Sequence, residues 1–296
     1  MDLSNESLYE LFLFLDSKEL VLCSLACWNF YALSRLESLW RGCIDKKHKE
    51  LFGMKTWYES CKVYHQMDVL RIGLKTNMPI IDLYTIKLFK LLGNQLTALP
   101  SEIGHLTNLQ ELRLENNKLT ALPSEIGHLT NLQGLYLNNN KLKALPSEIS
   151  NLTNLQRLWL HNNQLTAPPS EIGHLTNLHR LGLYSNQLTA LPSDIGHLTN
   201  LQQFALDHNK LTALPSEIRH LTNLQKLWLH SNQLAVLPSE IGHLTNLQYL
   251  GLYNNQLTAL PSEIGHLTNL QQLCVSKSTK IPPEIQNMHR LHVTKY

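Results

Sequence analysis

The hydrophobic residues of this chain follow a pattern that recurs every 23 residues from residue 86 onward. Each unit reads LxxLxLxxNxLxxLPSEIGHLTN, where x varies. The alternating LxL segment predicts a short strand whose leucines face the interior, and the proline predicts an irregular or helical turn on the opposite side. One unit cannot bury its leucines alone, so the units are expected to stack into a solenoid. The units begin at Ile86, Leu109, Leu132, Leu155, Leu178, Leu201, Leu224, Leu247 and Leu270.

The ninth residue of nearly every unit is an asparagine, at the point where the chain leaves the predicted strand. Its amide can both donate hydrogen bonds to, and accept them from, backbone groups buried in that turn. Stacked units therefore predict a ladder of asparagines along the solenoid, and Ser278 takes this place in the last unit. The predicted ladder consists of Asn94, Asn117, Asn140, Asn163, Asn186, Asn209, Asn232 and Asn255.

This template resembles the intracellular 23-residue leucine-rich repeat of Ras-suppressor-like proteins, which carries an LPxEI stretch. The resemblance covers about 200 residues and implies an α/β horseshoe with a parallel sheet on its concave face. Eight such repeats are expected over 86–269, followed by a degenerate capping repeat over 270–296. A connecting helix and an N-terminal half-repeat are expected over 49–85. Residues 1–48 lack the period and are expected to form a separate, small all-α domain.

Within that first domain, Leu8, Leu11 and Leu15 recur at helical spacing. In register with them, the segments Phe14-Leu15-Asp16, Ala26-Cys27 and Leu39-Trp40 resemble the F-box, although Ser4, Ala26 and Phe30 stand where that motif has proline, valine and tryptophan. The resemblance implies binding of a Skp-type adaptor and, through it, of a cullin-RING ubiquitin ligase. The alternative is that these leucines form only an intramolecular helical core. The candidate adaptor-binding residues are Leu3, Ser4, Leu8, Leu11, Leu15, Leu20, Leu25, Cys27, Leu39 and Trp40.

The units differ from one another mainly at the third, fifth and seventh positions, whose side chains alternate with the buried leucines and so point out of the sheet. An exposed sheet face bearing Trp, Tyr, Arg and His has the composition of a protein-binding hot spot. The alternative is that the aromatic residues only stabilise their neighbours on adjacent strands. The candidate target-binding residues are Arg113, Tyr136, Trp159, His161, Arg180, Tyr184, Asp207, Lys226, Trp228, His230, Tyr249 and Tyr253.

Composition narrows the classes of partner. Charged residues make up 16% of the 296 residues and the formal net charge is +2, which excludes the clustered basic surface of a nucleic-acid-binding protein. No apolar run is long enough to span a bilayer, and no secretory signal is expected. The five cysteines are odd in number and contain no CxxC pair, which favours reduced thiols in the cytoplasm or the nucleus.

Histidine is abundant, with 15 residues, because it belongs to the repeat. Ser101, Glu102 and His105 together suggest a catalytic set, but the same three residue types recur in most units, whereas an active site needs a unique constellation. The histidines of the template could form a ladder that binds metal or an exposed polar column, and the pattern favours the column. No GxGxxG, HExxH or GxSxG motif occurs. We therefore expect no enzyme activity, no cofactor and no metal site.

The function that these features favour is a substrate-recognition subunit of an SCF-type ubiquitin ligase. The F-box would bind the adaptor, and the concave face of the repeats would bind a target protein. The alternative is a non-enzymatic signalling scaffold of the small-GTPase-pathway type, in which the helical region serves only as a cap.

Overall fold

Ten parallel strands form one sheet in which the strand order follows the sequence order. The computed structural model describes residues 70, 74, 83, 85–288 and 290–296. Two compact units divide the chain, Met1–Tyr84 and Thr85–Tyr296. All ten candidate adaptor-binding residues lie outside the described residues, as do the expected 1–48 domain and most of 49–85.

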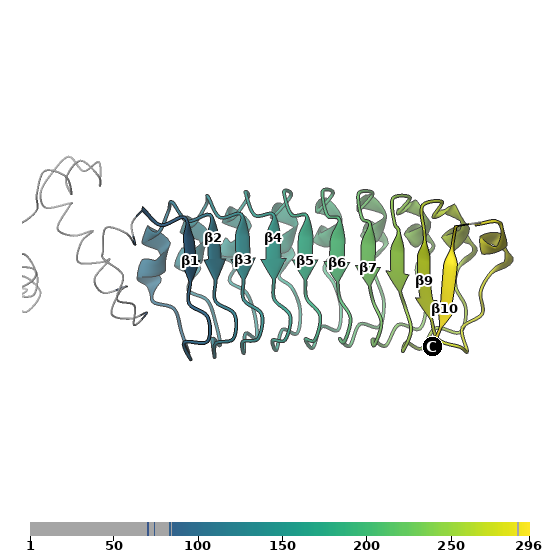
Figure 1. Ribbon diagram of the computed structural model, residues 1–296, viewed down its shortest axis with the longest axis horizontal. Helices are drawn as coiled ribbons and strands as arrows, with labels where there is room; N and C mark the ends of the chain where they lie inside the picture. Colours follow the sequence, from purple (N-terminus) through teal and green to yellow (C-terminus); the bar gives the residue numbers. More distant parts are fainter. Residues whose placement is uncertain (1–69, 71–73, 75–82, 84, 289) are drawn as a thin grey trace, which may run out of the picture. The chain divides into compact units, whose positions relative to one another are not determined.

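The strands contain three or four residues each and lie side by side in one row (Figure 1). Equivalent residues of successive repeats pair directly, as Leu135 does with Leu112 on one side and Leu158 on the other. Each position of the template therefore becomes a column that runs along the sheet. The strands are β1 (Leu88–Lys90), β2 (Glu111–Arg113), β3 (Gly134–Tyr136), β4 (Arg157–Trp159), β5 (Arg180–Gly182), β6 (Gln203–Ala205), β7 (Lys226–Trp228), β8 (Tyr249–Gly251), β9 (Gln272–Val275) and β10 (His292–Lys295).

Short 3-10 helices form the convex side, opposite the sheet (Figure 1). Each begins directly after the proline of the LPSEI stretch, whose φ near −70° and extended ψ start the turn, as Pro100 does with φ −69° and ψ 151°. The buried isoleucine of each helix, such as Ile103, closes the core from this side. The helices are η2 (Ser101–His105), η3 (Ser124–His128), η4 (Ser147–Asn151), η5 (Ser170–His174), η6 (Ser193–His197), η7 (Ser216–His220), η8 (Ser239–His243), η9 (Ser262–His266) and η10 (Pro283–Asn287).

The core lies between the sheet and these helices and consists almost entirely of the leucines and isoleucines of the template. Each repeat supplies them at the same places, as Leu178, Leu181 and Leu183 do in one repeat. The predicted leucine-rich-repeat solenoid is confirmed. No helix in the described part of the chain combines the length and hydrophobicity needed to cross a bilayer.

The asparagine ladder is present in the interior of the solenoid. Asn186, for example, donates from Nδ2 to the carbonyls of Leu160 and Leu183 at 3.0 and 2.9 Å, and its Oδ1 accepts the N–H of Leu165 at 3.1 Å. One side chain thus satisfies backbone groups of two neighbouring repeats.

The ladder ends differently at the two ends of the repeats. Asn94 is exposed and lies outside the ladder, contrary to the expectation, while Asn255 in the eighth repeat still makes the same bonds to Leu229 and Leu252. Beyond it the buried Thr279 donates from Oγ1 to the carbonyl of Leu257 at 3.1 Å. A threonine one residue after the expected Ser278 thus satisfies a carbonyl of the preceding repeat.

Candidate binding site on the concave sheet face

The variable positions of the repeats form three columns on the concave face. The third and fifth positions lie on the strands, and the seventh lies two residues after each strand ends. Because the strands pair in register, Arg180 lies between Arg157 and Gln203, and Gly182 lies between Trp159 and Ala205. The twelve candidate target-binding residues are all at least partly exposed on this face.

A hollow of about 330 Å³ lies on this face between Trp159 of β4 and Trp228 of β7. The two intervening strands carry Gly182 and Ala205 in the same column, so the space between the two indoles is left open. A Cβ at Gly182 would collide with Cε3 of Trp159, so glycine is required there for the indole to lie over β5. The hollow is lined by Trp159, Leu181, Tyr184, Gln203, Ala205, Asp207, Trp228 and His230.

The two long edges of the hollow differ in charge. At the third position, Gln203 of the lining pairs in register with the exposed Arg180 and Lys226. At the seventh position the lining includes Asp207 and His230. A partner in the hollow would therefore have basic groups along the edge formed by the third position and a carboxylate along the edge formed by the seventh position.

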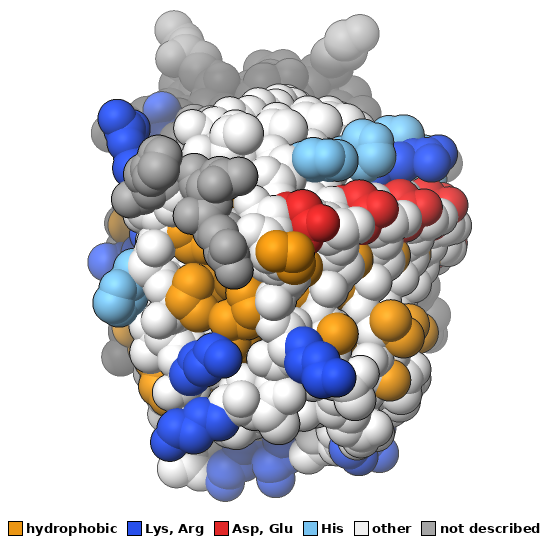
Figure 2. Space-filling model, turned by 90° about the vertical axis from the view of Figure 1, so that its right-hand side faces the viewer, with side chains coloured by type: hydrophobic (Ala, Val, Ile, Leu, Met, Phe, Trp, Pro, Cys, Tyr) orange, Lys and Arg blue, Asp and Glu red, His pale blue; other side chains and the backbone are white. Residues whose placement is uncertain are grey.

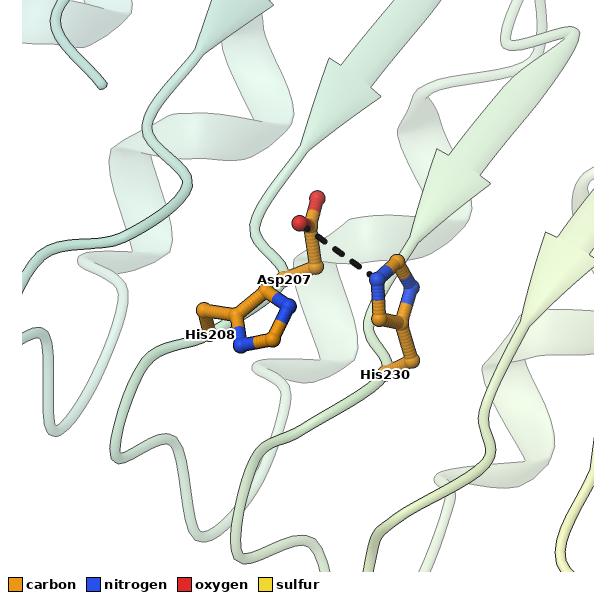
Figure 3. Close-up of side chains that lie close together, drawn as sticks. All are labelled: Asp207, His208 and His230. Atoms are coloured by element: carbon orange, nitrogen blue, oxygen red, sulfur yellow. Dashed lines mark ion pairs between the residues drawn. The ribbon is translucent and has the colours of Figure 1, made fainter. Parts of the chain in front are cut away.

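Asp207 and His230 face each other across adjacent repeats, with Oδ2 and Nε2 3.5 Å apart (Figure 3). Burial raises the pKa of the Asp207 carboxyl, and His230 opposes that shift. Burial lowers the pKa of the His230 imidazole, and Asp207 opposes it. His208 follows Asp207 and its ring lies edge-on to that of His230, with centroids 5.4 Å apart.

Ring stacking across repeats fixes several of the candidate side chains. His161 stacks on Tyr184 with centroids 4.1 Å apart, and His230 stacks on Tyr253 at 4.4 Å; in both pairs the rings are within 9° of parallel. Trp228 also contacts Tyr249, with ring centroids 5.5 Å apart. These contacts give the face a defined shape before any partner binds, which lowers the entropy cost of binding.

Five of the twelve candidate residues line the hollow, and among the others Arg113 and Tyr136 form a separate group. Arg113 donates from Nε to Oε1 of Glu111 at 2.6 Å, and its guanidinium lies 4.7 Å from the ring centroid of Tyr136. The hydrogen bond to Glu111 is the main reason that the pKa of Arg113 is raised. The group forms a second polar and aromatic surface over β2 and β3.

Some of the residues that shape the hollow were not among the candidates. Leu181, Gln203 and Ala205 line it, and Gly182 makes room for Trp159. The sequence does contain a signal for them, because small residues at the fifth position stand between two tryptophans of the same column. Large, chemically active side chains are apparent in the repeat pattern, whereas the small ones matter only through the space that they leave between the large ones.

The convex side carries the histidine column, where most of the imidazoles are exposed. Figure 2 shows histidine and acidic side chains in two adjoining rows along this side. In each of η2 to η9 the serine hydroxyl donates to the carboxylate of the next residue at 3.0–3.3 Å, as Ser170 does to Glu171 at 3.0 Å. The arrangement recurs from repeat to repeat on an exposed surface, which fits solvation of the solenoid.

The stability of the repeats is expected to fall between about pH 6.5 and pH 4 because of His161. Burial lowers the pKa of its imidazole from 6.5 to about 4. In this window the imidazole binds a proton in the unfolded chain but not in the folded chain, so the free energy of unfolding decreases as the pH falls. Above about pH 6.5 this histidine has no effect on the pH dependence of stability. We expect His161→Asn, which installs the residue that the preceding repeat has at Asn138, to reduce the loss. Urea midpoints at about pH 7 and pH 5 measure this, and equal pH dependence of the two chains would contradict it.

Comparisons with known proteins agree with this architecture. The family model described as a leucine-rich repeat region matches residues 58–181 and 226–295, and a second leucine-rich-repeat model matches residues 176–234. The F-box domain model matches residues 1–42. A search of curated proteins finds no match.

Solved structures with similar folds include two plant receptors. The leucine-rich-repeat ectodomain of the plant membrane receptor kinase GASSHO1/SCHENGEN3 from Arabidopsis thaliana, in complex with CASPARIAN STRIP INTEGRITY FACTOR 2, has 34% identity and a TM-score of 0.61 over 67% of this chain and 25% of that one. The plant peptide hormone receptor RGFR1 in complex with RGF2 has 33% identity and a TM-score of 0.52 over 66% of this chain and 37% of that one. This chain thus spans only a quarter to two fifths of the length of these two relatives.

A bacterial structure supports the fold alone. The functional domain of InlJ from Listeria monocytogenes has 23% identity and a TM-score of 0.60, over 72% of this chain and 49% of that one. The leucine-rich-repeat region model covers more than half of the chain, and its match agrees with the observed solenoid. The chain therefore belongs to the leucine-rich-repeat family, and it carries an F-box domain at residues 1–42 ahead of its repeats.

Proposed function

We propose that this chain is the substrate-recognition subunit of an SCF-type ubiquitin ligase. The observation that carries the proposal is the F-box match at residues 1–42, ahead of a repeat domain with an open, chemically varied face. In this assignment the F-box binds a Skp-type adaptor and the repeats bind a target protein. Both tasks are binding tasks, and the chain itself performs no chemical step. Its place of action would be the cytoplasm or the nucleus, where such ligases meet their targets.

The mechanism is proximity. A ligase complex that holds the target near a conjugating enzyme raises the effective concentration of the target's lysines at that enzyme. A stiff receptor suits this task, because it keeps the bound target within reach of the transferred ubiquitin. The continuous sheet and the internal asparagine ladder give the repeats that stiffness.

The hollow between Trp159 and Trp228 is the part of the repeats that we assign to the target. Half-buried tryptophans beside an open space are typical hot-spot residues, because a partner side chain can fill the space and exclude water from the indoles. The basic groups at Arg180 and Lys226 and the carboxylate of Asp207 would then orient the partner. RGFR1 is a peptide hormone receptor, which is consistent with a peptide segment as the occupant of such a face.

Adaptor binding by the purified full-length chain tests the proposal. We expect a one-to-one complex with a Skp-type adaptor on size-exclusion chromatography at micromolar concentrations. We expect Leu8→Glu combined with Leu11→Glu to abolish it, because charged groups would replace two leucines that recur at helical spacing in the F-box match. Ser4→Pro restores the residue that the F-box pattern has at this position and is expected to tighten binding.

Two outcomes would contradict the ligase assignment. One is the absence of any complex with the wild-type chain and with Ser4→Pro. The other is a complex of equal strength with the doubly charged variant, since adaptor binding would then not involve the F-box leucines. Retention of a target protein by a chain that never binds an adaptor would favour the signalling scaffold instead.

A further inference from the structure

Three side chains at one edge of the hollow form a cluster whose metal-binding chemistry goes beyond the proposed function. Asp207, His208 and His230 each offer one ligand atom, and these atoms all lie within 4.8 Å of one another. Figure 3 shows the Asp207 carboxylate and the His230 ring facing each other, with His208 beside Asp207. Asp207 and His230 are half-buried, so their side chains are held by their surroundings, and His208 is exposed, so an ion can reach the cluster from solvent.

The backbone explains how these residues converge. Asp207 and His230 occupy the seventh position of neighbouring repeats, after β6 and β7. His208 occupies the eighth position, where the chain turns with φ 53° in the left-handed region. The other repeats place Gly, Asn, Ser or Lys at this eighth position, so histidine occurs there once in the described repeats. The combination of one aspartate and two histidines is therefore a feature of this repeat pair and not of the template.

The geometry of the cluster is close to that of a metal site. Bonds of about 2.0–2.2 Å to zinc in tetrahedral geometry put neighbouring ligand atoms roughly 3.4 Å apart. Oδ2 of Asp207 and Nε2 of His230 are already 3.5 Å apart. Stacking on Tyr253 fixes the ring of His230, and the ligand atom of the exposed His208 lies within 4.8 Å of the other two.

We propose that Asp207, His208 and His230 bind a divalent transition-metal ion of the zinc class. Two imidazole nitrogens and one carboxylate oxygen are a ligand set that zinc and its neighbours in the first row accept, whereas magnesium and calcium prefer oxygen ligands alone. Three protein ligands leave a coordination position for water or for a side chain of a bound partner. Because Asp207 and His230 also line the hollow, such an ion would lie beside the surface that we assign to the target.

The chain contains a matched comparison for this site. His161 stacks on Tyr184 as His230 stacks on Tyr253, with the rings 9° from parallel in both pairs. The residues that correspond to Asp207 and His208 in the repeat before His161 are Asn138 and Asn139. The two places thus share the imidazole and its stacking partner, and they differ in the two other ligands.

Cobalt(II) titration of the full-length chain, stripped of metal with a chelator, tests the proposal. We expect one equivalent of Co²⁺ to give the visible absorption of a four- or five-coordinate site, and Zn²⁺ to displace it. Asp207→Asn combined with His208→Asn installs the residues that Asn138 and Asn139 represent beside His161. The variant is therefore expected to fold and to lose the Co²⁺ absorption. Conversely, a chain that keeps Asp207 and His208 and also carries Asn138→Asp and Asn139→His is expected to bind two Co²⁺ ions per chain.

The exposed convex histidines supply the background against which the signal is judged. All of these variants keep that column, so any Co²⁺ it binds is the same in each. An equal Co²⁺ signal from the wild-type chain and from the Asp207→Asn, His208→Asn variant would overturn the proposal. A wild-type chain that shows no one-to-one Co²⁺ complex at micromolar concentrations would overturn it as well.

Discussion

Replacing Asn186 by alanine is expected to lower the free energy of unfolding of the repeats by about 3 kcal/mol or more. The substitution leaves the N–H of Leu165 without its acceptor in the interior. It also removes one of two side-chain hydrogen bonds at the carbonyls of Leu160 and Leu183, which keep their bonds from Asn163 and Asn209. An unpaired buried N–H costs about 1–3 kcal/mol, and each hydrogen bond lost at a carbonyl costs about 0.5–1.5 kcal/mol. Urea unfolding followed by circular dichroism measures the change.

The neighbouring residue provides the control for this prediction. Ser185 precedes Asn186 at the left-handed position with φ 53°, where other repeats have asparagine. We expect Ser185→Asn to leave the urea midpoint nearly unchanged, because the new side chain faces solvent and suits the backbone. Equal losses for the two variants would show that the ladder bonds are not what stabilises the interior.

The second large effect is expected when Trp159 and Trp228 are both replaced by alanine. Each truncation of a hot-spot tryptophan costs about 2 kcal/mol or more of binding free energy, which is roughly 30-fold in affinity. The double variant is therefore expected to lose the target protein completely at working concentrations. Quantitative capture of partners by the tagged full-length chain measures this, with the thermal midpoint as the check on folding.

An exposed apolar residue away from the hollow supplies the matched control. Val236 is 69% exposed between β7 and η8. We expect Val236→Ala to keep every captured protein. If the tryptophan variant also keeps its partners, the two indoles serve only to stabilise neighbouring strands, which is the alternative interpretation of their exposure.

Much of the fold could be predicted from the sequence, because every repeat has the same 23-residue pattern and therefore the same predicted elements. The period of leucines and the asparagine at the ninth position predict the strand, the ladder and the stacking, as Asn117 and Leu114 illustrate. The failure at Asn94 has a physical reason. A ladder asparagine bonds to the repeat before it, as Asn117 does to Leu91, and Asn94 belongs to the first repeat of the series.

The candidate site was harder to predict, because its shape depends on combinations across repeats. Trp159 borders the hollow only because the next two residues at the fifth position, Gly182 and Ala205, are small. The contact between Asp207 and His230 is likewise hard to predict, since the two residues are 23 positions apart and meet only through the register of β6 and β7. Tyr296 contacts Tyr253, with ring centroids 4.4 Å apart and ring planes tilted by 34°, and the repeat pattern does not predict this contact.

A comparison of three tagged full-length chains tests the central claim, that separate parts of one chain bind the ligase and the target. The baits are the wild-type chain, the Leu8→Glu, Leu11→Glu variant and the Trp159→Ala, Trp228→Ala variant. Quantitative mass spectrometry of the captured proteins is expected to show opposite losses. The leucine variant should lose the Skp-type adaptor and cullin while keeping the target, and the tryptophan variant should do the reverse. Capture of neither adaptor nor cullin by the wild-type chain, or loss of the same proteins by both variants, would contradict the account.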